Sequence, residues 1–123
     1  MLSMLHAVIG VIVIVANLSS AAVFWRAHRS QTEPQPIGWR VIWLARLSLL
    51  AQIGLGLVLT IAGYVSLNNH YAIGLMAAGS LWVGGQRASA SKQPYLILAF
   101  TSAVAGVCAL AAYWLGTMAG YSA

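Results

Sequence analysis

Four long apolar runs constrain the fold more than any other feature of this sequence. They cover about residues 4–27, 38–65, 69–86 and 94–117, and short polar stretches separate them. A membrane-spanning helix needs about 20 apolar residues, and each run is close to that length. Backbone polar groups inside a bilayer must hydrogen-bond within the protein, so such runs form helices. The sequence therefore predicts an all-α membrane protein, a single domain over residues 1–123 with four transmembrane helices.

The scarcity of charge supports the same class. Charged residues make up 6% of the 123 residues, and the mean hydropathy is +0.85, whereas soluble domains carry about 25% charged residues. The net charge of +5 arises from six basic residues and one acid, Glu33. The basic residues lie at the ends of the apolar runs, so they indicate topology and not nucleic-acid binding. The single cysteine, Cys108, excludes an internal disulfide and a multi-cysteine metal site.

Short connections between consecutive runs predict an up-down-up-down bundle. Pro34 and Pro36 are expected to prevent helix in the first polar connection, residues 30–38, and Pro94 suits the first turn of the last helix. One face of the membrane collects Arg26, Arg29, Arg40, Arg87 and Lys92. The positive-inside rule makes this face cytoplasmic. We therefore expect both termini on the outer side of a bacterial inner (cytoplasmic) membrane.

The motif His-x-x-Ile-Gly occurs twice, at residues 6–10 and 70–74. A glycine four residues after a histidine lies on the same face of a helix. The two motifs open the first and third runs, whose helices point in the same direction. His6 and His70 are therefore expected at similar depth near the outer surface, on helices that are diagonal neighbours across the core.

This pair predicts a bis-histidine haem b. A flat macrocycle between the two helices would take one imidazole on each face of its metal, with His6 and His70 as ligands of the haem iron. Gly10 and Gly74 would leave room for the porphyrin. Two alternatives stay open: a structural role without any cofactor, and a chlorophyll-type pigment, whose magnesium needs only one histidine. A third histidine, His28, lies among arginines and is expected to be solvated.

Other polar residues inside the runs are few. Buried amides in lipid need partners, and Gln52 and Asn17 are expected to pair between helices. Arg46 lies about two turns inside the second run and is expected to extend towards the interface, with lipid head-group binding as the alternative. No carboxylate lies within a run, although proton relays and ion-coupled transporters normally carry one. No nucleophile–base pair or phosphate-binding loop is present either, so we expect no active site of its own.

The segment Gln-Ile-Gly-Leu-Gly at 52–56, followed by a short turn and by His70 opening a helix, resembles a half-module of the haem A synthase family. The resemblance covers roughly the first three runs. It implies a four-helix bundle that holds haem between histidines on alternate helices, with His6 and His70 as the axial ligands. The chain departs from that family in having one histidine pair and no acidic residue of the catalytic half, which argues against synthase activity.

The sequence thus predicts a small membrane cytochrome b-like subunit that holds one haem near the outer face. It would pass electrons within a larger respiratory or photosynthetic complex, with that integral-membrane complex and lipids as its partners. The alternatives are a cofactor-free structural accessory subunit of such a complex and a (bacterio)chlorophyll-binding linker subunit.

The predicted topology can be tested by cysteine labelling in a background where Cys108 is replaced by alanine. A cysteine at Gln35 or Ser89 should resist a membrane-impermeant thiol reagent in intact cells and react once the cells are permeabilised. A cysteine at Ser122 should react in intact cells. Labelling of the two connections from outside would reverse the orientation.

Overall fold

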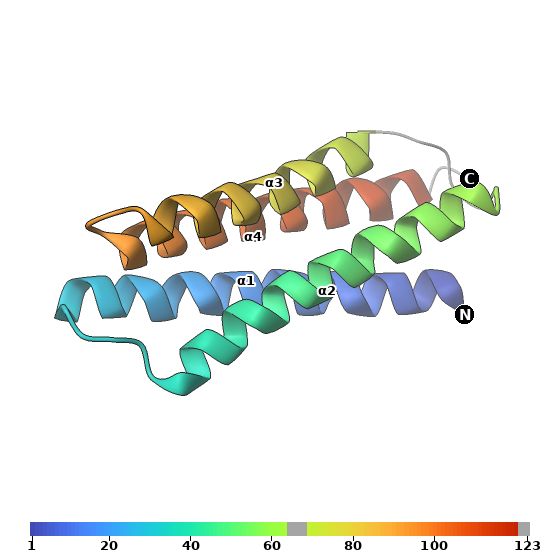
Figure 1. The fold of residues 1–123 in the computed structure, drawn as a ribbon. Helices are drawn as coiled ribbons and strands as arrows, with labels where there is room; N and C mark the ends of the chain where they lie inside the picture. The colour runs from blue at the N-terminus through green and yellow to red at the C-terminus, as the bar shows by residue number, and fades with distance from the viewer. Residues whose placement is uncertain (64–68, 121–123) are drawn as a thin grey trace.

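The computed structural model describes residues 1–63 and 69–120, which form a bundle of four α-helices (Figure 1). These are α1 (Leu2–Ser30), α2 (Pro36–Ile61), α3 (Asn69–Ser89) and α4 (Pro94–Gly120). The predicted all-α four-helix architecture is confirmed.

The helix ends differ from the predicted ones by a few residues. Pro36 does not prevent helix, because proline suits the first turn, and it opens α2 two residues earlier than expected. α1 continues to Ser30 and ends at Gln31, which adopts the left-handed conformation with φ 53°. α2 ends at Ile61 in place of about residue 65, and Gly63 follows in a turn with φ 77°. Residues 64 and 65 of the expected helix end, and Ser66 after them, lie outside the described residues.

Three of the described helices are long and apolar enough to cross a membrane: Met4–Ser30, Pro36–Ile61 and Pro94–Met118. Large apolar side chains such as Trp82 and Phe100 are exposed on the outside of the bundle, as expected of a surface that faces lipid. α3 is shorter and rich in small residues, so its role as a fourth span remains a prediction.

The helices pack in the order α2, α1, α4, α3, since α1 contacts both α2 and α4, and α4 contacts α3. α2 and α3 touch only slightly, and α2 passes obliquely across α1 (Figure 1). Glycines allow the close approaches, as is common between membrane helices. Gly84 of α3 lies against Thr101 of α4, and Gly106 of α4 lies against Leu18 of α1.

Two apolar clusters fill the interior. One comprises Val13, Leu49, Ala77, Leu81 and Ala105. The other comprises Phe24, Ile42, Ala88, Leu98 and Ala99. Between them the hydroxyls of Ser20 and Ser102, both fully buried, hydrogen-bond at 3.2 Å and join α1 to α4.

The expected pairing of Gln52 with Asn17 is wrong. The Asn17 amide donates to the carbonyl of Val13 in its own helix, at 2.8 Å. The reason is the offset between α1 and α2: Gly38 lies against Val23, well before the end of α1. Gln52 is fourteen residues beyond Gly38, and fourteen residues back from Val23 is Ile9. Gln52 therefore reaches the N-terminal end of α1, beside Gly10 and about two turns before Asn17.

The packing of α3 on α4 yields a matched pair of variants. Gly84→Ala should lower the free energy of unfolding by about 1–3 kcal/mol, because the new methyl group would overlap Thr101. Gly79→Ala, in the same helix, has open space at the new Cβ and should leave stability unchanged or raise it by up to about 1 kcal/mol. Denaturant titration in detergent micelles measures both. Equal effects at the two positions would contradict this packing.

Candidate functional site at the histidine pair

The structure brings His6 of α1 and His70 of α3 together near the beginnings of their helices. The ring centroids are 5.8 Å apart, and the ring planes make an angle of 56°. Both side chains are half-buried. Because 64 residues separate them in sequence, the contact depends on the whole bundle.

His70 is held by α4. Its Nδ1 lies 2.6 Å from the carbonyl oxygen of Ala112. A carbonyl can only accept a hydrogen bond, so Nδ1 carries the hydrogen, and in the neutral ring the lone pair lies on Nε2. A donor bond from one ring nitrogen to a backbone carbonyl is the usual way in which proteins orient a metal-binding histidine. Gly116 makes room for the ring, since a Cβ there would lie 3.2 Å from His70 Nδ1.

His6 is held by α2. Its Nε2 lies 3.0 Å from Nε2 of Gln52. The amide nitrogen can only donate, so His6 Nε2 accepts and its Nδ1 carries the hydrogen. That Nδ1 and the Gln52 Oε1 are both buried without a hydrogen-bond partner. Each unpaired buried group costs about 1–3 kcal/mol, so this part of the bundle holds polar groups beyond what its own packing satisfies.

A second hydrogen-bond network joins α2 to α3 beside the histidines. The Thr60 hydroxyl donates to the Tyr71 hydroxyl at 2.6 Å, and Tyr71 donates to the carbonyl of Gly56 at 3.1 Å. The Tyr71 ring also meets the His70 ring edge-on, with centroids 5.3 Å apart. A Cβ at Gly56 would lie 3.2 Å from the Tyr71 ring and 3.5 Å from His6, so the absent side chain allows both contacts.

The two glycines of the repeated motif have different surroundings. At Gly74 a Cβ would meet no atom within 4 Å. At Gly10 it would lie 3.2 Å from the Tyr113 ring and 3.3 Å from the Gln52 amide. The expectation that both glycines leave room for a porphyrin therefore needs correction at Gly10, whose face is filled. The offset of α2, which brings Gln52 to this level, accounts for the difference.

The donor pair fits the two axial positions of one metal ion. Imidazole nitrogens bind metals at about 2 Å, which places the centroids of two opposed rings about 6 Å apart, close to the observed 5.8 Å. The described residues contain no group of three or more His, Cys, Asp or Glu side chains that could hold a metal. Two imidazoles therefore suit a metal that brings its other ligands, as haem does.

His28 takes no part in this site. It lies near the C-terminal end of α1, with its ring 6.0 Å from that of Trp25. The 22 residues between His6 and His28 correspond to about 33 Å along a helix.

Sequence reasoning missed Tyr71, Tyr113, Gly116 and the Ala112 carbonyl. Tyr71 had one signal, its position next to His70. The residues of α4 had none, because nothing in their spacing distinguishes them from other small and aromatic residues of that run.

Comparison with known proteins gives no match: no protein-family model, no curated protein and no solved structure is significantly similar to this chain. The function is therefore inferred from the geometry of the described residues.

The network at Tyr71 can be tested by removing one hydroxyl. Tyr71→Phe should lower the free energy of unfolding by about 0.5–1.5 kcal/mol, because the hydrogen bond from Tyr71 to Gly56 is lost, while Thr60 can still donate to the Gly56 carbonyl at 3.0 Å. Tyr113→Phe is the control, because the Tyr113 hydroxyl makes no hydrogen bond within the described residues. Chemical denaturation in detergent micelles reports both. If Tyr71→Phe left the free energy of unfolding unchanged, the network at Tyr71 would not stabilise the contact between α2 and α3.

Proposed function

We propose that the protein is a small membrane cytochrome b-like subunit in which His6 and His70 hold one haem b near the outer end of the bundle. The observation that carries the proposal is the approach of the two rings to 5.8 Å, from diagonal helices. The repeated His-x-x-Ile-Gly motif and the resemblance to a half-module of the haem A synthase family support it.

The residues around the pair would set the properties of the centre. The bond from His70 Nδ1 to the Ala112 carbonyl fixes the ring orientation and makes Nε2 a better electron donor to a metal. If Gln52 turned away from His6 Nε2, that nitrogen could bind the same haem iron as His70. Bound haem would supply one-electron chemistry, and its potential would depend on burial and on these hydrogen bonds.

Two histidine ligands favour electron transfer over catalysis. With both axial positions filled by protein, none remains for oxygen or a substrate. By the positive-inside rule the basic connections would be cytoplasmic, and this end of the bundle would lie at the outer face, where the subunit would exchange electrons with a quinol or a periplasmic carrier. The exposed apolar side chains of the bundle suit contact with lipids and with a larger integral-membrane electron-transfer complex.

A specific observation favours a second candidate, a cofactor-free accessory subunit. Tyr113 and Gln52 fill the face of Gly10 in the described structure. In that case the bonds of His6 to Gln52 and of His70 to Ala112 serve only to join helix ends.

An absorption spectrum of the purified protein tests the proposal. We expect a Soret band and, in the reduced-minus-oxidised difference, the bands of a six-coordinate low-spin haem b. His6→Ala and His70→Ala should each lower haem retention or give five-coordinate high-spin iron, whereas His28→Ala should do neither. A folded, colourless protein, even after expression with added haem, would favour the accessory subunit. An effect of His70→Ala alone would favour a pigment with one ligand.

Two further variants distinguish the space that the porphyrin would need from the binding of its iron by the histidines. Gly74→Leu should expel the haem although both histidines remain, because the new side chain would occupy the open space at that position. Gln52→Ala should keep the haem, because this side chain must leave His6 before the metal can bind. If His6 and Gln52 were only a structural pair, Gln52→Ala would instead destabilise the bundle.

A further inference from the structure

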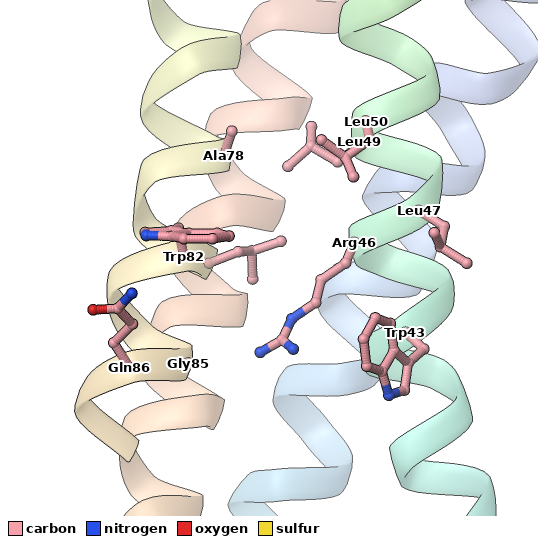
Figure 2. A pocket seen from close by; sticks show the side chains of 10 residues that line it. Trp43, Arg46, Leu47, Leu49, Leu50, Ala78, Trp82, Gly85 and Gln86 are labelled. Atoms are coloured by element: carbon pink, nitrogen blue, oxygen red, sulfur yellow. The ribbon is translucent and has the colours of Figure 1, made fainter. Parts of the chain in front are cut away.

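A cleft of about 330 Å³ lies between α2 and α3, at the level where these helices diverge (Figure 2). It is separate from the histidine pair and closer to the cytoplasmic end. Its principal lining residues are Trp43, Arg46, Leu50, Ala78, Trp82 and Gly85. The amide of Gln86 also lines the cleft, and the remaining lining is apolar or aromatic, so the cleft presents one cation on a largely hydrocarbon-like surface.

Arg46 reaches from α2 across the cleft. Its guanidinium extends towards α3 (Figure 2), and a Cβ at Gly85 would lie 2.8 Å from its Nη2. Its Cζ is 5.6 Å from the centroid of the Trp43 ring. The guanidinium therefore lies between an aromatic ring and the bare backbone of a glycine, in a space that any side chain at position 85 would close.

This cation has no counter-charge within the described residues. The one acid of the chain, Glu33, is exposed in the connection before α2, and the described residues form no ion pair. Arginine keeps its charge, and inside a span such a group normally pairs with another charge or lines a functional pathway. An anion from outside the chain is the partner that charge complementarity calls for.

We propose that the cleft binds an anionic phospholipid of the cytoplasmic leaflet. The phosphate would accept two hydrogen bonds from the planar Arg46 guanidinium. One acyl chain would lie between Leu50 and Ala78, and Trp43 and Trp82 would flank the glycerol region, where tryptophan is commonly found. Arg40 and Arg87 near the same membrane face add attraction for anionic lipid.

Charge complementarity favours an anionic lipid over an apolar transmembrane helix of another protein. The cleft combines one cation with apolar walls, which matches a phosphate joined to acyl chains. The proposal does not depend on haem, since it concerns other residues at the other end of the bundle.

Quenching of tryptophan fluorescence by brominated lipids tests the proposal on the full chain. Purified protein is reconstituted into vesicles of phosphatidylcholine that contain increasing fractions of brominated phosphatidylglycerol, or of brominated phosphatidylcholine with the same acyl chains. The wild type should prefer the anionic lipid by about tenfold or more, the effect of one charge-assisted contact. Arg46→Gln should remove this preference, and Arg40→Gln should keep most of it.

A second variant keeps the test decisive if Arg46→Gln does not fold. Gly85→Leu retains the arginine but fills the cleft beside the guanidinium, and it should also remove the preference. Circular dichroism establishes that each variant is helical. An anionic-lipid preference that survives both substitutions would show that general surface charge attracts the lipid, and would overturn the proposal. Absence of any preference in the wild type would also overturn it and would favour a partner helix as the occupant.

Discussion

A polar group inside a bilayer must find its hydrogen-bond partner within the protein, because hydrocarbon offers none. The described polar side chains of the spans follow this constraint in different ways. Asn17 uses a carbonyl of its own helix, and Ser20 uses a serine of the neighbouring helix. His70 uses a backbone carbonyl of α4. His6 and Gln52 satisfy each other only in part, and Arg46 has the Trp43 ring but no anion. The constraint is incompletely met at both proposed binding sites, and also at Asn17, whose Oδ1 is buried without a hydrogen-bond partner among the described residues.

The offset of α2 relative to α1 determines both proposed sites. Gly38 lies against Val23, which shifts α2 towards the N-terminus of α1, and the hydrogen bond from Tyr71 to Gly56 fixes α2 to α3 at that end. Between these two attachments α2 runs obliquely across α1 (Figure 1). The same crossing brings Gln52 to His6 and carries the beginning of α2 away from α3.

Run length and the membrane constraint were enough to predict four helices, because they depend on composition alone. The meeting of His6 and His70 was also predictable, because both motifs open helices that run in the same direction. The surroundings of the histidines were not. Whether Gly10 faces a porphyrin or the Gln52 amide depends on the offset between helices, which a single close contact at Gly38 decides. Periodicity shows which face of a helix a residue occupies, but not which residue of the neighbouring helix lies opposite it. The predicted pairing of Gln52 with Asn17 is wrong for this reason.

The cleft at Arg46 follows from that crossing and from the small residues of α3. With α2 attached to α3 near Gly56 and to α1 near Gly38, large side chains on α3 would be needed to close the gap between α2 and α3. Ala78 and Gly85 line it from that side. Their small size leaves the guanidinium within reach of a ligand, and a leucine at position 85 would cover it. The bare backbone of Gly85 accommodates the guanidinium, and a phosphate bound to that group would need the same open side. The combination of a half-buried cation, two tryptophans and a bare backbone is therefore better explained by an anionic lipid than by imperfect packing.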